Sequence, residues 1–339
     1  MTSNFIDLGR RFSIVEKDAE KDPDRIKESF WSSTPTVGWS DLLQQYRVVI
    51  LSEPGAGKTE EFQHAARIKK NQGEFSFFIR LELVEDYTWE DCFGIDTSGE
   101  FDQWLGSSDL AWLFLDSVDE ARLSDKKNFE KALLCIARKL GQSKSRVHIF
   151  ISSRVQEWLA TSDLELFDRL LPGPYQQNVH SKEYIDQSIN GQTEGNSPEA
   201  TEPLAAKVYQ LQPLNREQIR GFSEFSGVAN TTLFLDEIDK SNSEIFANRP
   251  QDLLDLNVFW QKYSRLGKHE EMLDENIRRK LIENHPGHDD HGPLSPQQAD
   301  YGIQILAAAA TLQKNLPSYF QIKMFRQTDR RSPLRQKKF

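Results

Sequence analysis

The sequence predicts an α/β fold, a doubly wound parallel sheet followed by a smaller all-helical domain. The first observation is the run Val48-Val49-Ile50-Leu51, which is continuously apolar, largely β-branched and followed by a turn signal. Such a run is typical of a strand buried on both faces of a parallel sheet. The second observation is that similar runs alternate with helical patterns, and the third is that only helical patterns follow Leu211. Alternating strands and helices favour a parallel sheet wound by helices.

The elements of the sheet follow in order along the chain. Ser40 is placed to cap a short helix that contains Leu42 and Leu43. Strands are expected at residues 48–51, 75–83, 111–115, 147–151 and 208–211. Between them, Phe62, Ala65 and Ala66 share one helix face, and the apolar residues of 129–140 recur at helical spacing. We therefore expect helices on the sheet after the first and third strands.

Cap signals mark the helices of the second domain. Asn215 and Gln218 form a capping-box pattern, and Gly227 stands where a helix end is expected. Further helices are predicted near Pro250, around Leu273, Ile277 and Leu281, and from Ser295, Pro296 and Gln298. The expected division is an N-terminal segment 1–40, a sheet domain 41–213 with a polar loop at 175–205, a helical domain 214–315 and a basic tail 316–339.

Composition excludes several classes of protein. The mean hydropathy is -0.62, and no apolar run reaches the roughly 18 residues that a membrane span needs. With no secretory signal at the N-terminus either, we expect a cytoplasmic protein without a membrane partner. Cys92 and Cys135 lack the spacing of a disulfide framework or a zinc site. The net charge of -10 disfavours a surface built to hold nucleic acid, although the basic residues after Gln321 leave that partner open.

A glycine-rich loop follows the first predicted strand and opens a helix. In Ser52-Glu53-Pro54-Gly55-Ala56-Gly57-Lys58-Thr59, the glycines let successive backbone N–H groups surround phosphate oxygens, and the helix N-terminus adds positive potential. Lys58 supplies a cation to the phosphates and Thr59 a hydroxyl to Mg²⁺. The nucleotide-binding candidates are Pro54, Gly55, Ala56, Gly57, Lys58, Thr59 and Glu60. The alternative is an ordinary turn before a helix.

Acidic residues follow the strand at 111–115. In a doubly wound sheet, ligands collect at the carboxyl ends of the strands, which places Asp116 beside the glycine-rich loop as a Mg²⁺ ligand. Glu120 is the candidate base that polarises water, and Asp119 assists it or binds metal. The alternative is a helix N-terminus that carries acids because its dipole favours negative charge.

Polar residues also end the strand at 147–151. There the hydroxyl groups of Ser152 and Ser153 are candidates to orient a water molecule, and Arg154 is a candidate to contact a γ-phosphate. Of the two serines, Ser153 is the nucleotide-binding candidate. The alternative is an arginine in a surface loop. ATP and Mg²⁺ are therefore the expected cofactors.

These three motifs, in this order, resemble the NACHT group of STAND P-loop ATPases. The group's Walker A loop corresponds to SEPGAGKT, its D-x-x-D-E strand end to DSVDE and its [ST]-[ST]-R sensor to SSR. Residues 209–214 look like the link to the family's helical domain, and Pro250 looks like the proline that touches adenine. The resemblance implies that Lys58 and Thr59 bind phosphate and metal, Asp116 metal, Glu120 water and Arg154 the γ-phosphate. Ser52 in place of glycine and the Glu60-Glu61 pair depart from the pattern.

Three functions are consistent with these residues. The main hypothesis is an ATP-driven switch with protein partners or self-association, which the resemblance connects with bacterial signalling or antiviral defence. The second is a scaffold that binds ATP without hydrolysing it. The third is a nucleic-acid-dependent, AAA+-like ATPase that uses the basic tail. Relatives of the NACHT type are usually longer, with a sensor and an effector. The chain is therefore expected to be a truncated or standalone NTPase core, or a core to which partner proteins supply those parts.

Overall fold

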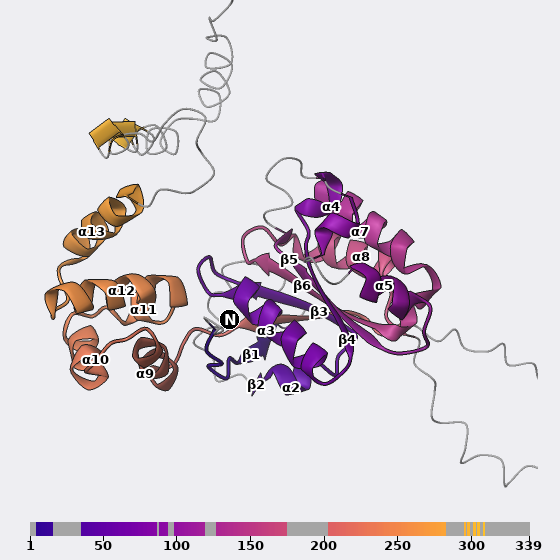
Figure 1. The fold of residues 1–339 in the computed structure, drawn as a ribbon, viewed down its shortest axis with the longest axis horizontal. Coiled ribbons are helices and arrows are strands. Elements are labelled where there is room, and N and C mark those ends of the chain that lie inside the picture. Colours follow the sequence, from indigo (N-terminus) through magenta and orange to yellow (C-terminus); the bar gives the residue numbers. More distant parts are fainter. Residues whose placement is uncertain are drawn as a thin grey trace, which may run out of the picture. The chain divides into compact units, whose positions relative to one another are not determined.

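A computed structural model describes most of the chain. The described residues are 5–15, 35–86, 88–93, 98–118, 127–174 and 203–282, together with 295, 297, 298, 301, 302, 304, 305 and 308. They belong to two compact units, 1–265 and 266–339. The first unit contains the sheet, its helices and the helices α9 to α12, and Figure 1 labels these elements.

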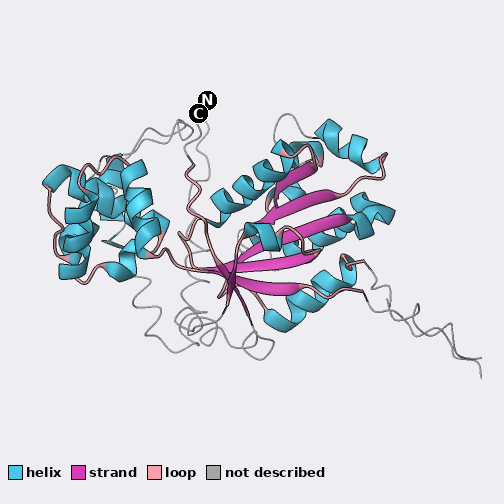
Figure 2. Cartoon of the chain, turned by 90° about the horizontal axis from the view of Figure 1, so that it is seen from below, coloured by secondary structure: helices cyan, strands magenta, loops and turns pink. Residues whose placement is uncertain are grey.

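A seven-stranded sheet organises the first unit. Its order is β2-β1-β7-β3-β6-β5-β4. The strands are β1 (Phe12–Ile14), β2 (Thr36–Val37), β3 (Arg47–Ser52), β4 (Phe75–Arg80), β5 (Ala111–Asp116), β6 (Val147–Arg154) and β7 (Lys207–Leu211). The pairs β4·β5, β5·β6, β6·β3 and β3·β7 are all parallel, and Figure 2 shows these strands fanning out with the twist usual for such sheets. The predicted α/β fold is confirmed.

Helices cover both faces of the sheet (Figure 1). On one face lie α4 (Leu83–Asp86), α5 (Ser98–Leu105), α7 (Asn128–Leu140) and α8 (Ala160–Leu170), and on the other lie α2 (Trp39–Leu42) and α3 (Lys58–Asn71). Short 3₁₀ helices occupy Glu90–Cys92 and Gly141–Arg146. Along β3, Val49 and Leu51 enter the first core, whereas Val48 and Ile50 enter the second. This alternation explains why the strand reads as an uninterrupted apolar run.

The first two strands were not predicted. β1 pairs antiparallel with β7 and with β2, so residues before position 41 contribute to an otherwise parallel sheet. Phe12 is fully buried there and contacts the ring of Trp39, with ring centroids 4.9 Å apart. Strands of three and two residues flanked by charged residues leave too short a pattern for a sequence argument.

Two strand boundaries also differ from the prediction. The strand expected at 75–83 ends at Arg80, and Leu83 already begins α4. The strand expected at 147–151 continues to Arg154, so Ser152, Ser153 and Arg154 are its last residues and do not follow it. Cys92 is buried in the first core, on one face of the sheet, while Cys135 is partly buried.

Helices follow β7. They are α9 (Arg216–Phe225), α10 (Thr231–Lys240), α11 (Glu244–Ala247) and α12 (Pro250–Tyr263) in the first unit and α13 (His269–Ile282) in the second. The capping box of Asn215 and Gln218 forms as predicted, and Pro250 occupies the first turn of α12. The helix predicted near Pro250 does not directly follow α9, because α10 and α11 lie between them. Among the helices described, none is both long and apolar enough to cross a membrane.

Several predictions concern residues outside the described ranges. These are Asp119, Glu120, most of the polar loop at 175–205 and the basic tail. The residues at the two ends of the polar loop are described. The N–H of Leu204 donates to the carbonyl of Pro174 at 3.0 Å, and a Cβ on Gly173 would lie 2.5 Å from the carbonyl oxygen of Leu204. The two ends of this loop therefore lie side by side.

Candidate functional site

The loop between β3 and α3 has the backbone that its glycines predict. Gly55 and Gly57 both adopt left-handed conformations, with φ of 75° and 86°, and Gly57 caps α3. Lys58 is then the first residue of the helix, where the unpaired N–H groups and the helix dipole favour an anion. This conformation costs residues other than glycine about 1–2 kcal/mol. The two glycines therefore allow a tight loop that other residues would adopt only under strain.

Ser52 occupies the position at which the glycine-rich pattern has its first glycine, and the loop accommodates it. Ser52 is the last residue of β3, pairs with Arg154 of β6 and is fully buried. It is not among the residues with positive φ, and its hydroxyl donates to the carbonyl of Glu53 at 3.1 Å. This position requires an extended residue, so serine in place of glycine leaves the shape of the loop intact.

Neighbouring segments approach the loop glycines closely. A Cβ on Gly55 would lie 3.0 Å from the Cβ of Gln251, and a Cβ on Gly57 would lie 3.7 Å from the ring of Pro250. The N–H of Gln251 also donates to the carbonyl of Gly55 at 3.2 Å. The first turn of α12 therefore packs directly on the glycine-rich loop, and it includes Pro250, the residue that the resemblance assigns to the adenine.

A chain of hydrogen bonds joins the loop helix to two strand ends. Thr59 donates to Asp116 Oδ2 at 2.6 Å, and Ser152 donates to Asp116 Oδ1 at 2.5 Å. The hydroxyl of Ser152 in turn accepts from the N–H of Ser117 at 2.9 Å. Asp116 is 1% exposed, so both of its oxygens are held in one orientation. Ser117 has φ of 65°, which turns the chain sharply after β5.

Only one of the two predicted hydroxyl groups at the end of β6 joins this chain. Ser153 was the nucleotide-binding candidate, but its hydroxyl donates to the carbonyl of Arg154 at 3.2 Å. Successive residues of a strand point to opposite faces, which separates Ser153 from Asp116 and directs Ser152 towards it. Arg154 itself is exposed and lines the same cavity as the loop.

The site opens into a cavity of about 700 Å³ within the first unit. Its polar end consists of the loop residues 54–57 and the first turn of α3, including Lys58, Thr59 and Glu60. Its other walls are largely apolar and come from Phe222 and Phe225 of α9, Pro250 and Leu254 of α12 and the N-terminal residues Phe5, Ile6 and Leu8. A volume of this size suits a small organic ligand.

Arg10 is a site residue that the sequence argument missed. Its side chain is 3% exposed, and Nη1 donates to the carbonyl of Ala56 at 2.9 Å while Nη2 donates to that of Gln212 at 2.8 Å. Its Nε is buried without a hydrogen-bond partner. Burial lowers the pKa of Arg10, and the nearby Glu61 carboxylate opposes that shift. One guanidinium thus connects the glycine-rich loop to the segment that links β7 and α9.

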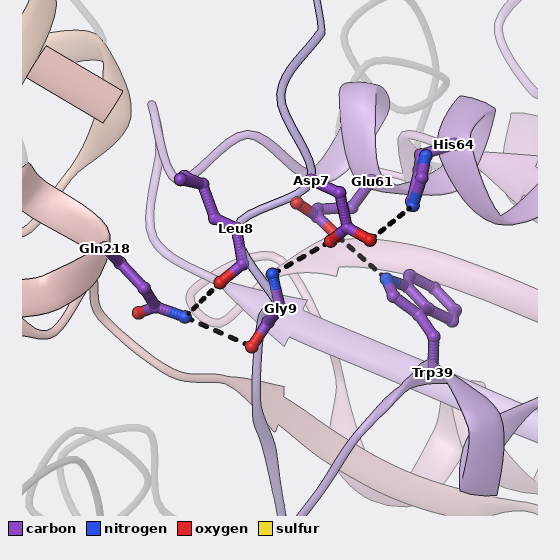
Figure 3. A network of polar contacts seen from close by, with 7 residues as sticks. All are labelled: Asp7, Leu8, Gly9, Trp39, Glu61, His64 and Gln218. Carbon is purple, nitrogen blue, oxygen red and sulfur yellow. Dashed lines mark hydrogen bonds and ion pairs between the residues drawn. The ribbon is translucent and has the colours of Figure 1, made fainter. Parts of the chain in front are cut away.

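The two glutamates on the first turn of α3 differ in environment. Glu60 is exposed, whereas Glu61 is 6% exposed and accepts a hydrogen bond of 2.8 Å from Trp39 Nε1, as Figure 3 shows. Burial raises the pKa of Glu61, and the Trp39 hydrogen bond and Arg10 oppose the rise. The buried carboxyl therefore has partners away from the loop, and Glu60 is the member of the pair that points to solvent at the cavity.

The oxygen atoms at Thr59 and Asp116 fit a magnesium ion. Mg²⁺ prefers hard oxygen ligands and is commonly held by one or two carboxylates together with substrate phosphates and water. Asp116 and Thr59 offer a carboxylate and a hydroxyl 2.6 Å apart next to the loop. Within the described residues, no group of three or more His, Cys, Asp or Glu side chains could hold a metal ion. A metal at this place would therefore depend on phosphate oxygens for most of its ligands.

The chain matches no protein-family model and no curated protein. Solved structures with a similar fold include the Walker-type ATPase PABY2304 of Pyrococcus abyssi, with a TM-score of 0.39, 12% identity and coverage of 79% of this chain and 73% of that one. AMPPCP-bound DnaA from Aquifex aeolicus has a TM-score of 0.34, 14% identity and coverage of 79% and 70%. PCH-2 of C. elegans has a TM-score of 0.34, 12% identity and coverage of 79% and 68%. The likeness is distant, so the case for a function rests on the cavity itself.

Proposed function

We propose that the chain binds ATP with Mg²⁺ and hydrolyses it. The observation that carries this proposal is the hydrogen bond between Thr59 and Asp116, which brings a carboxylate to the first turn of a helix that begins at a left-handed glycine. Lys58 and the loop residues 54–57 line the cavity beside this link. Backbone N–H groups, an ammonium group and a carboxylate are the combination that a metal-bound triphosphate requires.

Each residue at the polar end has a distinct task in this proposal. The N–H groups of residues 55–59 and the ammonium of Lys58 neutralise phosphate oxygens. Thr59 and Asp116 would hold the magnesium ion, which would supply positive charge to offset that of the phosphates. Arg154 stabilises charge on the transferred group, and Glu120 orients the attacking water, with Asp119 assisting it or binding metal. Ser152 keeps Asp116 in position.

The apolar walls provide the place for the base. Phe222, Phe225, Pro250 and Leu254 line the cavity from α9 and α12, while Phe5, Ile6 and Leu8 line it from the N-terminal side. A planar purine gains favourable packing against rings of this kind, and the triphosphate then reaches the loop.

We further propose that ATP acts as a switch of the NACHT/STAND type. Two successive carbonyl groups of the loop accept hydrogen bonds from other segments. That of Gly55 accepts from the N–H of Gln251, and that of Ala56 accepts from Arg10. Because Arg10 also holds Gln212, occupation of the loop changes contacts of α12 and of the β7–α9 link together. A ligand that favours one arrangement of such contacts shifts the equilibrium between arrangements. Protein partners or self-association would detect the change, in a role such as bacterial signalling or defence.

The test compares ATP binding and turnover in wild type and three variants. Lys58→Ala should abolish binding that calorimetry detects in wild type, and Glu120→Gln should bind ATP with turnover reduced at least about a hundredfold. Lys70→Ala, at the far end of α3, removes the same charge and should change neither quantity. Wild-type protein that binds no ATP at millimolar concentration, or Lys58→Ala that binds as well as wild type, contradicts the proposal.

The same measurements separate the switch from the scaffold. A scaffold that binds ATP without hydrolysis would show a thermal shift on adding ATP, because a ligand of the native state stabilises it by mass action. Its turnover would stay at background, and Glu120→Gln would change nothing. Stimulation of turnover by DNA or RNA would instead favour the nucleic-acid-dependent ATPase.

A further inference from the structure

The N-terminal residues 5–9, which we name the strap, form one wall of the cavity. Phe5, Ile6 and Leu8 line it, and Arg10 follows immediately as the anchor on the glycine-rich loop. Figure 3 shows Asp7, Leu8 and Gly9 of the strap between His64 of α3 and Gln218 of α9. The strap has no strand or helix of its own and precedes β1.

The first attachment of the strap is to α3. The ring of Phe5 stacks on that of His64 with centroids 4.4 Å apart and planes 23° apart, and the guanidinium of Arg67 lies 5.3 Å from the Phe5 ring centroid. His64 Nε2 lies 3.5 Å from Asp7 Oδ2. The Asp7 side chain is 64% exposed, so water competes for this contact and the attachment is weak.

The second attachment of the strap is to α9. Gln218 Nε2 donates to the carbonyl of Leu8 at 2.8 Å and to that of Gly9 at 3.2 Å. The opposite end of the same amide, Oε1, accepts from the N–H of Asn215 at 2.9 Å in the capping box. Gln218 is 8% exposed, so every polar atom of its side chain is used and shielded. The N-terminal cap of α9 and the strap are thus held by one side chain.

Within the strap itself, Asp7 shapes the turn. Its Oδ1 accepts from the N–H of Gly9 at 2.8 Å, and Gly9 has φ of 59°. A Cβ on Gly9 would meet no atom within 4 Å, so the glycine serves conformation and leaves the surroundings open. The strap is therefore a short preformed turn with one attachment on each side of the cavity.

We propose that the strap is a gate for nucleotide exchange, closed by Gln218 on α9 and by His64 on α3. The inference rests on the proposed function, because it concerns passage of ATP and ADP through the same cavity. The strap lines the cavity and is attached by two amide hydrogen bonds and one ring stack, so it opens without unfolding the sheet. Opening of the gate limits both arrival and departure of nucleotide.

The variant Gln218→Glu tests the gate. Glutamate keeps the oxygen that accepts from Asn215 and so keeps the capping box, but it has no N–H for the carbonyls of Leu8 and Gly9. With a fluorescent ATP analogue in stopped flow, association and dissociation rates should both rise about tenfold, while the equilibrium constant changes less. Gln44→Glu makes the same chemical change at an exposed position in the turn after α2, where the amide also donates to a carbonyl, and should leave both rates unchanged.

A second variant tests the attachment to α3. Phe5→Leu keeps an apolar side chain in the cavity wall but removes the ring stacked on His64. Its rates should also rise, by a smaller factor. The combination of Phe5→Leu with Gln218→Glu should raise them further. A melting curve without nucleotide, matching that of wild type, checks that the fold is intact.

The outcomes distinguish the gate from the proposed function. If wild type binds the analogue and both variants exchange it at the wild-type rate, the gate is wrong while ATP binding stands. If Gln218→Glu slows association or weakens binding only through dissociation, the strap is a binding contact and the gate is likewise wrong. If wild type does not bind the analogue, the proposed function itself fails.

Discussion

The hydroxyl of Thr59 donates to Asp116 across 2.6 Å, which joins the first turn of α3 to the carboxyl end of β5. The two residues are 57 positions apart in sequence. Thr59 follows the glycine-rich loop after β3, and Asp116 is the last residue of β5. Because Ser152 holds the other oxygen of Asp116, the carboxylate has no freedom to turn away. The two hydroxyl groups therefore hold the carboxylate in one orientation.

Ser152 and Ser153 are both fully buried neighbours but should respond differently to substitution. Ser152→Ala removes the donor to Asp116 and leaves the N–H of Ser117 without its acceptor, so we expect a loss of about 1–3 kcal/mol in the free energy of unfolding. Ser153→Ala loses one hydrogen bond to a carbonyl and should cost less than about 1 kcal/mol. Urea unfolding of the two variants measures the difference. Equal losses would show that the link to Asp116 has no energetic role.

Gly55→Ala should be more harmful than Gly73→Ala, although both glycines have positive φ, 75° and 81°. A Cβ at Gly73 meets no atom within 4 Å, so that variant isolates the conformational cost of about 1–2 kcal/mol. A Cβ at Gly55 would in addition lie 3.0 Å from the Cβ of Gln251. We expect a larger loss of stability and weaker ATP binding for Gly55→Ala alone. Calorimetry with ATP would contradict this if both variants bound alike.

Arg47, the first residue of β3, should be a structural arginine whose substitution strongly lowers the stability of the fold. It is 2% exposed, burial lowers its pKa to about 10, and its five N–H groups donate to carbonyls of Tyr46, Lys144, Val147, Leu171 and Pro172. Arg47→Lys keeps the charge but cannot reproduce this fork, so several carbonyls lose their donor. We expect a loss of about 3 kcal/mol or more in unfolding free energy. Arg80→Lys, at an exposed position, is the control and should change stability by less than about 0.5 kcal/mol.

Acid should destabilise the protein partly through His148. Its ring is 4% exposed and stacks between those of Tyr46 and Trp112, with centroids 4.2 and 4.8 Å away. Burial lowers the pKa of His148 from its ordinary value of 6.5, and the Gln45 carbonyl opposes the shift. The unfolded chain therefore takes up the proton first. Stability from this group is complete above about pH 7.5 and falls, by at most about 1.4 kcal/mol per pH unit, as the pH drops below 6.5.

His148→Phe checks this sign, because phenylalanine keeps an aromatic ring in the stack without a titrating proton. Urea unfolding between pH 5 and 8 should give a shallower decline for the variant than for wild type. A residual slope remains from His64, whose pKa burial also lowers. An identical pH profile in both proteins would remove His148 as the cause.

The sequence located those parts of the fold that depend on local patterns. Val48 to Leu51 read correctly as a buried strand because helices cover both faces of β3. The approach of Thr59 to Asp116 was expected because ligands gather at the carboxyl ends of parallel strands. The capping box at Asn215 and Gln218 was also predictable, since a stretch of four residues suffices to define it.

Other parts depend on contacts between distant segments. β1 consists of three residues, and its partner β7 comes much later in the chain, so no window of sequence contains the signal. Arg10 reads as one charge in a charged segment, and only its contacts with Ala56 and Gln212 mark it as part of the site. Ser153 was preferred for the site without using the alternation of strand residues, which would have favoured Ser152. Asp119 and Glu120 stay predictions, because they lie outside the described residues.

The pairing of β1 with β7 also fixes the order in which the protein is completed during synthesis. Phe12 lies opposite Leu211, so a growing chain must release about 200 more residues before that pair exists. At translation rates of 5–20 residues per second, this takes about 10–40 s. Until then the amino-terminal residues have no place beside β7, and a ribosome that stalls earlier holds a chain whose ligand cavity lacks one side.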